Sequence, residues 1–330
     1  MERRLFLQSA VGSFILAAEG AFASSASSAS QAPQLPAKAD ACVRFGLATD
    51  IHYAEPPYRK LNARSTSCFP DSLEKFRRAM DRFSREDLDF VAELGDFKDT
   101  SLGGTRESTL STLRTIEAEY ARYSGERHYV AGNHDFDRIS LSDFMTHTAA
   151  RSASEDGIYR AFTAGGIRFI ILDGCFKSPK GGHYSLGNYS WKKAFVPEKE
   201  MAWLARELKS GDSPVIVFIH QLLNYWDAPK IPAAYMLGNA REVVSLLEKS
   251  ARVLAVFSGH YHKGGRSFRN GIHYIVHRGM IRKPLPKNAF SIVTVDRNLN
   301  IFVEGFADQP SLECPKHSET RKRSKELRLL

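Results

Sequence analysis

The sequence predicts an α/β fold in which two mixed β-sheets are flanked by helices. In the first half of the chain, strand-like apolar runs alternate with helical patterns, an order that favours parallel strands covered by helices. Two helical patterns in the second half also precede strand-like runs that end in histidine. Gly165-Gly166 and Asn270-Gly271 are turn signals that mark antiparallel hairpins. Two sheets packed face to face, with helices outside, accommodate this order.

The spacing of apolar residues defines the expected elements. Short apolar runs predict strands at residues 43–49, 90–94, 128–131, 159–162, 167–172, 215–219, 253–257, 266–269, 272–276, 290–295 and 301–306. Apolar residues three and four apart predict helices from Asp71 onward and over residues 105–123, 198–209 and 239–249. Asp71 and Glu74 have the spacing of a capping box at the start of the first helix.

The composition is that of a globular protein. Of its 330 residues, 43% are hydrophobic and 25% are charged, which is enough for one large domain, expected over residues 42–310. The formal net charge of +9 favours a small anionic partner, such as a phosphate compound. Residues 311–330 form a basic tail with six Lys or Arg and three Glu. Because part of the charge lies in this tail, no concentrated stripe for nucleic acid is expected. The sequence does not indicate the oligomeric state.

The first residues have the features of an export signal. Arg3 and Arg4 precede an apolar stretch over residues 5–18, and Ala21-Phe22-Ala23 is a small-x-small cleavage site. The arginine pair resembles a bacterial twin-arginine signal, and the general secretory route is the alternative. The apolar stretch is shorter than the roughly 20 residues that span a bilayer, so no stable membrane span is expected. The sequence thus predicts a signal peptide over residues 1–23, a flexible linker over 24–41, and a periplasmic or extracellular protein cleaved near Ala23.

The four cysteines allow two interpretations. They stand at positions 42, 68, 175 and 314, and none has the CxxC spacing of a zinc or redox site. In an exported protein, a single disulfide involving Cys42 or Cys68 is one possibility. Four unpaired thiols are the other, because a chain of this length does not need covalent staples.

Metal-binding residue types follow five of the apolar runs. Beyond the carboxyl ends of these expected strands stand Asp50, His52, Asp96, Asn133, His134, His220, His260 and His262. Residues two apart in an extended segment point to the same side, so Asp50 with His52, and His260 with His262, can each aim a pair of ligands at one place. Ligands in α/β sheets gather at the carboxyl ends of strands. The pattern predicts a polynuclear metal site with oxygen and nitrogen ligands.

These motifs resemble those of the calcineurin-like metallophosphoesterases. In order they are Asp-x-His, Gly95-Asp96, Gly-Asn-His-Asp, a lone His after a strand, and Gly-His-x-His, over roughly residues 43–306. The resemblance implies the four-layer sandwich of that family and a dinuclear centre that activates a hydroxide. It places Asp50, His52 and His262 on one ion, Asn133, His220 and His260 on the other, and Asp96 between them. Such ligands suit manganese, iron or zinc.

The resemblance leaves His134 off the metals and so gives it a different function. We expect it to protonate the leaving oxygen or to stabilise charge, with Asp135 orienting it; a supporting hydrogen-bond donor is the alternative for His134. Asp99 is expected to cap a loop or to support a ligand. Asp173 also follows an apolar run but has no place in the ligand pattern. Four aromatic residues near these strand ends could stack a base or pack in the core: Phe136, Tyr225, Trp226 and Tyr235.

A narrower resemblance concerns residues 48–54, 259–265 and 271–274. These segments are similar to the manganese-dependent ADP-ribose/CDP-alcohol diphosphatases. The expected function is therefore metal-dependent hydrolysis of phosphoester or phosphoanhydride bonds, with nucleoside diphosphate-linked compounds as candidate substrates. The alternatives are a phosphomonoesterase, a phosphodiesterase of other substrates, or a noncatalytic module stabilised by metal.

Overall fold

The computed structural model describes residues 38–59, 69–227 and 230–316. The expected signal peptide, most of the expected linker, Cys68 and the tail from residue 317 lie outside the described residues. Within the described part of the chain, no helix combines the length and apolar character needed to cross a membrane. Cys42, Cys175 and Cys314 are unpaired.

The first sheet has six strands and is mixed. Its order is β14-β13-β12-β1-β2-β3, with β1 parallel to β2, β2 parallel to β3, and the remaining pairs antiparallel. The strands are β1 (Ala41–Ala48), β2 (Phe90–Glu93), β3 (Glu126–Tyr129), β12 (Ala289–Asp296), β13 (Ile301–Ala307) and β14 (Leu312–Cys314). The folded part therefore begins before the expected residue 42 and continues beyond residue 310. At the beginning, β1 already includes Ala41. At the end, β14 lies at the start of the expected tail and pairs with β13.

The second sheet also has six strands, in the order β10-β11-β9-β8-β5-β4. Its strands are β4 (Arg160–Ala164), β5 (Ile167–Ile171), β8 (Val215–Phe218), β9 (Val253–Ser258), β10 (Gly265–Arg269) and β11 (Ile272–Val276). The pairs β4–β5 and β10–β11 are antiparallel hairpins and the inner pairs are parallel. Both expected glycine turns are confirmed, since they connect these hairpins. A short separate hairpin joins β6 (Phe176–Ser178) to β7 (Gly181–His183).

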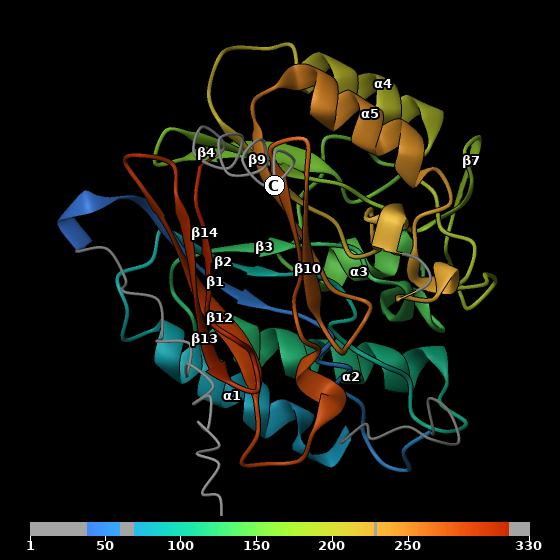
Figure 1. Cartoon of the computed structure of the whole chain (residues 1–330). Coiled ribbons are helices and arrows are strands. Elements are labelled where there is room, and N and C mark those ends of the chain that lie inside the picture. The colour runs from blue at the N-terminus through green and yellow to red at the C-terminus, as the bar shows by residue number, and fades with distance from the viewer. Residues whose placement is uncertain (1–37, 60–68, 228–229, 317–330) are drawn as a thin grey trace, which may run out of the picture. The chain divides into compact units, whose positions relative to one another are not determined.

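Helices cover the outer face of each sheet, which gives four layers (Figure 1). The helices are α1 (Ser72–Phe83), α2 (Arg106–Tyr120), α3 (Leu141–His147), α4 (Glu198–Glu207) and α5 (Ala240–Ser250). Side chains of α1 and α2 pack on the first sheet, and those of α4 and α5 pack on the second. Between the sheets lies a core rich in aromatic rings, in which Phe45 stacks on Phe90 at 4.9 Å and meets the edge of Phe169 at 5.4 Å. The expected fold class is confirmed.

One expected local motif is wrong. Asp71 is the N-cap residue of α1, but its side chain makes no capping hydrogen bond. Its Oδ2 atom instead accepts a hydrogen bond of 2.9 Å from the backbone N–H of Leu285. The carboxylate therefore ties the start of the helix to a distant loop, a partner that local spacing cannot reveal.

Candidate metal centre

The predicted ligands follow parallel strands of both sheets. Asp50 and His52 come after β1, Asp96 after β2, and Asn133 opens a 3-10 helix, Asn133–Phe136, after β3. His220 follows β8, and His260 and His262 follow β9. Since parallel strands end at the same edge of a sheet, the two sheets bring these residues together.

The backbone at several ligands is held in the left-handed region. The φ angles are 51° at Asp50, 47° at His52, 57° at Asp96 and 63° at His260. For residues other than glycine this conformation costs of order 1–3 kcal/mol and persists only where the surrounding structure enforces it. Each of these residues turns sharply away from its strand, which directs the side chain towards the common centre.

Two glycines allow the loops to approach one another. At Gly132, a Cβ atom would lie 2.0 Å from the backbone nitrogen of Asp96, and at Gly95 it would lie 2.5 Å from Nδ1 of His220. Gly95 also has a φ of 98°, which disfavours other residues. A side chain at either position would push a ligand-bearing loop out of place.

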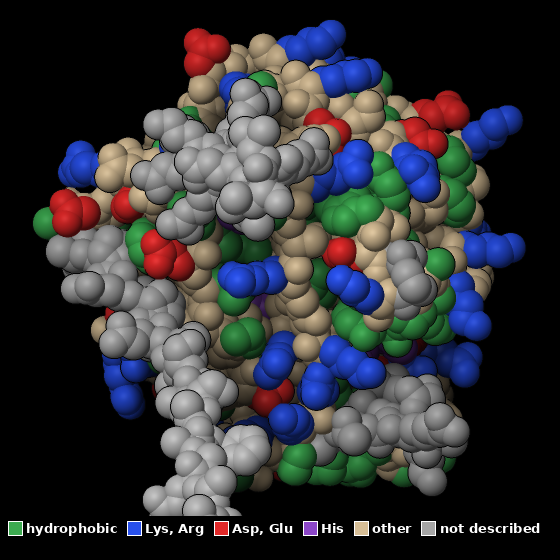
Figure 2. All heavy atoms as spheres, in the orientation of Figure 1, with side chains coloured by type: hydrophobic (Ala, Val, Ile, Leu, Met, Phe, Trp, Pro, Cys, Tyr) green, Lys and Arg blue, Asp and Glu red, His purple; other side chains and the backbone are tan. Residues whose placement is uncertain are grey.

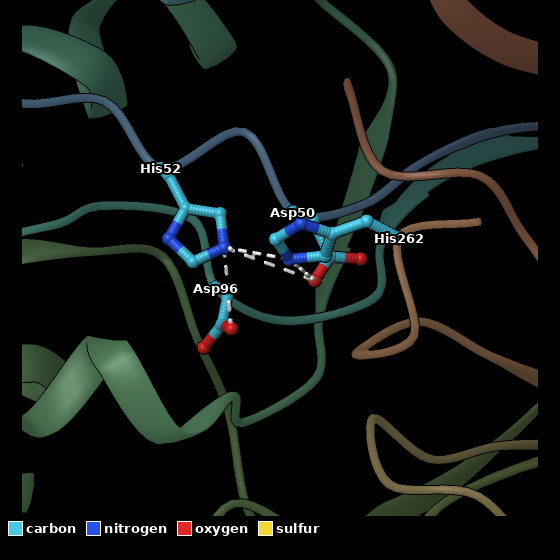
Figure 3. A group of neighbouring side chains, drawn as sticks. All are labelled: Asp50, His52, Asp96 and His262. Atoms are coloured by element: carbon cyan, nitrogen blue, oxygen red, sulfur yellow. Dashed lines mark hydrogen bonds and ion pairs between the residues drawn. The ribbon is translucent and has the colours of Figure 1, made fainter. Parts of the chain in front are cut away.

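The first cluster consists of Asp50, His52, Asp96 and His262 (Figure 3). Nε2 of His262 lies 3.1 Å from Oδ1 of Asp50, and Nε2 of His52 lies 3.4 Å from Oδ2 of Asp96. The two Nε2 atoms of His52 and His262 are 3.2 Å apart. Ligands on one ion with bonds of about 2.1 Å stand roughly 3 Å apart. The spacing therefore fits a set of atoms that share one metal ion.

The second cluster consists of Asp96, His220 and His260. Nε2 of His220 lies 3.2 Å from Oδ2 of Asp96, the same oxygen that faces His52. Nε2 of His260 and Oδ1 of Asn133 are buried and have no hydrogen-bond partner among the described residues. Buried polar atoms without a partner are costly unless something binds them. These atoms therefore fit a second ion, and Asp96 is the residue common to both clusters.

Hydrogen bonds orient two of the imidazoles. Nδ1 of His52 lies 3.0 Å from Oδ2 of Asp99, and Nδ1 of His220 lies 2.7 Å from the carbonyl oxygen of Leu94. A proton on Nδ1 leaves the lone pair of Nε2 free for a metal ion. Asp99 also accepts from the backbone N–H of Thr100 at 2.6 Å, so it both supports a ligand and caps the loop.

Burial and charge set the protonation of these ligands. Burial disfavours the charged form of His52, yet the carboxylate of Asp96, aided by Asp50 and Asp99, raises its pKa to about 10. For His220, burial is likewise outweighed by Asp96, and the pKa is raised to about 9. Burial, followed by repulsion from His220, lowers the pKa of His260 to about 3. Because a ligating imidazole must be neutral, an ion at either cluster competes with a proton on His52 or His220.

His134 lies beside the first cluster, with its ring 4.7 Å from that of His52. Its Nδ1 atom lies 3.0 Å from Oδ2 of Asp137 and contacts the guanidinium of Arg59. Arg59 also bonds Asp99 and, at 2.9 Å, Asp137. The carboxylate of Asp99 and the imidazoles of His52 and His134 lie close enough to hold an ion. The guanidinium already supplies positive charge there, so we assign no ion to that group.

The expectation that Asp135 orients His134 is wrong, because the carboxylates beside Nδ1 of this imidazole are those of Asp137, at 3.0 Å, and Asp99, at 3.6 Å. Asp135 instead accepts backbone hydrogen bonds at 2.9–3.3 Å from Gly132, Asp96, Phe97 and Lys98. It therefore holds the loop after β2 against the loop after β3. Sequence reasoning missed Asp137, Arg59 and Tyr189, whose hydroxyl donates to Asp137 at 2.5 Å. The only local signal was that Asp137 stands three residues after His134.

The remaining candidates divide between the site and the core. Phe136 is fully buried, and Asp173 accepts from Ile158, Cys175 and His183, which are structural contacts. Tyr225 and Trp226 pack against the guanidinium of Arg269. Tyr235 lies at the centre, with its ring 5.2 Å from that of His260. Trp191, which the sequence did not single out, lies 5.7 Å from the same imidazole.

The fold and this arrangement define a class of protein, the hydrolases that use two metal ions bridged by a carboxylate. The chain belongs to the calcineurin-like phosphoesterase family, whose model matches residues 43–264. It is therefore a metal-dependent hydrolase of phosphoester bonds, as its sequence motifs predicted. The nature of the ions is left open among manganese, iron and zinc.

Similar proteins agree with this assignment. A manganese-dependent ADP-ribose/CDP-alcohol diphosphatase of Danio rerio is 27% identical over 300 residues, covering 76% of this chain and 92% of that protein. A protein of the same name from Arabidopsis thaliana is 20% identical over 288 residues, covering 77% and 91%. A solved structure of a dimetal phosphatase from Danio rerio has a TM-score of 0.74 at 23% identity, covering 84% of this chain and 100% of that chain. The structural likeness shows the shared fold.

Proposed function

We propose that the protein hydrolyses the phosphoanhydride bond of nucleoside diphosphate-linked compounds. The observation that carries this choice is the pair of partly exposed aromatic rings, Trp191 and Tyr235, which lie 5.3 Å apart beside the ligand His260. A planar base can stack on such rings while its phosphates reach the metal centre. The names of the diphosphatase relatives support the same choice.

The side chains of the centre have separate functions. One ion would be held by Asp50, His52 and His262, and the other by Asn133, His220 and His260. Asp96 would bind both ions. Two bound ions supply Lewis acidity and a water molecule with a lowered pKa.

We assign the proton for the leaving oxygen to His134. Because its Nδ1 atom faces Asp137, Nε2 is the atom from which it would donate that proton. Asp137 and Arg59 fix the position of the ring. Asp135 holds together the two loops that carry Asp96 and Asn133.

A substrate panel tests the function. ADP-ribose, CDP-choline, bis-p-nitrophenyl phosphate and p-nitrophenyl phosphate should be compared with manganese present. We expect kcat/KM for the two diphosphates to exceed that for the esters, although p-nitrophenolate is a good leaving group. A preference for p-nitrophenyl phosphate would make the protein a phosphomonoesterase, and a preference for the bis ester would make it a phosphodiesterase. Hydrolysis of none would favour a noncatalytic module.

Substitution of the aromatic pair tests the stacking. Stacking of a base on an aromatic side chain is worth about 1–3 kcal/mol, so Trp191→Ala with Tyr235→Ala should raise KM for ADP-ribose about tenfold or more. The matched control is Tyr225→Ala, which removes an aromatic ring that packs on Arg241. An unchanged KM in the double variant would argue against base stacking at this place.

We also propose that the chain is exported and that the folded domain is released from a signal peptide over residues 1–23. The charged start, the apolar stretch and Ala21-Phe22-Ala23 support this proposal. Protein recovered outside the cytoplasm should begin near Ser24 by N-terminal sequencing. Replacement of Arg3 and Arg4 by lysine should block export if the twin-arginine route is used. Uncleaved protein confined to the cytoplasm would contradict the proposal.

A further inference from the structure

The segment that carries His260 and His262 continues into a strongly cationic region. Residues 259–295 contain seven Lys or Arg and no Asp or Glu. This stretch includes β10, β11 and most of β12, so the charge belongs to the folded domain and not to the tail. Figure 2 shows Lys and Arg side chains gathered on the face around and below β10, with few acidic side chains among them. The expected absence of a nucleic-acid stripe concerned the whole chain and its tail, and this local concentration of positive charge was not part of that expectation.

Part of this charge lines a cavity of about 240 Å³. The cavity lies between the start of β10 and the turn from β13 to β14, and its cationic lining residues are Lys263, Arg266 and Arg278. Arg278 is held by Asp308, whose carboxylate also bonds Lys283. Among the described residues, Lys263 and Arg266 form no ion pair with a carboxylate, although Arg266 lies close enough to Glu313 and Cys314 to line a second cavity with them. Two cations of the cavity are thus available to an anion.

The cavity adjoins the metal centre through the backbone. Lys263 follows the ligand His262 directly, and the N–H of Gly279, next to Arg278, donates to the carbonyl oxygen of His262 at 3.1 Å. A Cβ atom at Gly279 would lie 3.0 Å from Cβ of Asp50 and 3.0 Å from Cγ of His262. The cationic cavity therefore lies beside the first cluster. The aromatic pair Trp191 and Tyr235 lies beside His260 of the second cluster.

We infer that the cavity lined by Lys263 and Arg266 selects substrates that carry a negative charge on the group joined to the diphosphate at the end opposite the nucleoside. This inference rests on the proposed function. With the base beside His260 and the scissile diphosphate at the ions, the far half of the substrate extends past His262 towards the two cations. A phosphate monoester at that end would receive charge-assisted hydrogen bonds from both. The cavity is a small concavity and not a flat stripe, which favours a small-molecule phosphate over a polyanion or an anionic lipid surface.

A charge series at the far end of one substrate tests the inference. CDP-choline, CDP-glycerol and CDP-glycerol carrying a terminal phosphate share the nucleotide and the scissile bond, while the far group is cationic, neutral and anionic. Hydrogen bonds to charged groups are worth about 1.5–3 kcal/mol, so we expect kcat/KM to rise by about tenfold or more from CDP-glycerol to its phosphate. From CDP-choline to CDP-glycerol the rate should also rise, because repulsion between like charges is removed. Lys263→Gln combined with Arg266→Gln should flatten the series and leave CDP-glycerol within about twofold of the wild type. Lys209→Gln combined with Lys249→Gln, which removes two exposed charges from the ends of α4 and α5, should retain the preference.

The outcomes separate the inference from the proposed function. If the wild type cleaves all three compounds at equal rates, the cavity does not select charge, and the proposed function stands. If none of the three is cleaved while simple phosphate esters are, the proposed function fails first. Loss of binding to anionic lipid vesicles in the Lys263 and Arg266 double variant, with kinetics unchanged, would make the region a membrane-binding surface and overturn the inference.

Discussion

The two halves of the metal centre share Asp96 but have different surroundings. The first half contains a second carboxylate, Asp50, and the carboxylate of Asp99 stands behind its ligand His52. In the second half the other ligands, Asn133, His220 and His260, are groups that bind a metal in their neutral form, and the partner behind His220 is a backbone carbonyl. Charged ligands hold a cation more strongly, so the comparison indicates a tight first position and a weaker second one.

The difference extends to what each half offers a substrate. Beside the first half lie His134 with Arg59 and Asp137, and the cationic cavity at Lys263. Beside the second half lie the rings of Trp191 and Tyr235. In the proposed function, proton transfer and charge recognition would therefore occur beside the first half, and stacking beside the second. A substrate with two unlike ends has one preferred orientation across such a site.

Removal of the shared carboxylate should produce the largest effect, because it acts on both halves at once. We expect Asp96→Asn to reduce bound metal from about two ions to less than one. Activity should fall by at least about a thousandfold, since two ions supply several kcal/mol of charge stabilisation. Elemental analysis and kcat/KM are the measurements, and Asp173→Asn is the matched control, because Asp173 is also a buried aspartate that follows a strand. Two tightly bound ions in Asp96→Asn would show that Asp96 does not bridge.

The next effect separates proton transfer from metal binding within the first half. A poor leaving alkoxide needs a proton, while p-nitrophenolate leaves unaided, and a positioned general acid is worth about 10²–10⁴ in rate. His134→Ala should therefore lower kcat/KM by this factor for an alkyl ester and far less for a matched p-nitrophenyl ester. Metal content should equal that of the wild type. Equal losses on both esters, with both ions retained, would leave His134 as a charge-stabilising group.

A smaller effect tests whether Asp99 accounts for the strength of the first half. Partners of metal-binding imidazoles are typically worth about 10–100-fold in metal affinity or activity. Asp99→Asn should weaken the tighter ion by this amount and leave the affinity of the second ion within about twofold, as measured by manganese titration. Asp137→Asn is the control, since Asp137 contacts His134 and not a ligand. A uniform weakening of both ions would mean that Asp99 acts through the fold and not through His52.

Much of this centre could be predicted from sequence, because ligands at strand ends need only a local pattern. An apolar run followed by Asp-x-His identifies a strand and its ligands together, and the same is true of Gly-His-x-His after β9. Asp135 shows the limit of such reasoning. Its neighbour in sequence is His134, but its carboxylate points at backbone amides of the loop after β2.

The parts that could not be predicted depend on distant segments. Arg59 reaches Asp99 and Asp137 from the loop after β1, and Trp191 reaches His260 from the loop between β7 and α4. Neither loop has a periodic pattern that would place its side chains. The cationic region is a different case, because its signal was present in the sequence. A charge count over the whole chain and its tail concealed the absence of acidic residues from 259 to 295.

Titration of the two ion positions with manganese gives the smallest and most direct test of the difference between the two halves of the centre. Ion affinity rises with the number of charged ligands, so the position with Asp50 and Asp96 should bind manganese about tenfold or more tightly than the position with Asn133. Titration of the metal-free protein should then show two phases. His260→Ala should remove the weak phase and leave the strong one, because His260 belongs to the second cluster alone. Asp50→Ala should remove the strong phase, because Asp50 belongs only to the first. If His260→Ala removed the strong phase instead, the neutral half would be the tighter one, and ligand charge would not be what distinguishes the two halves.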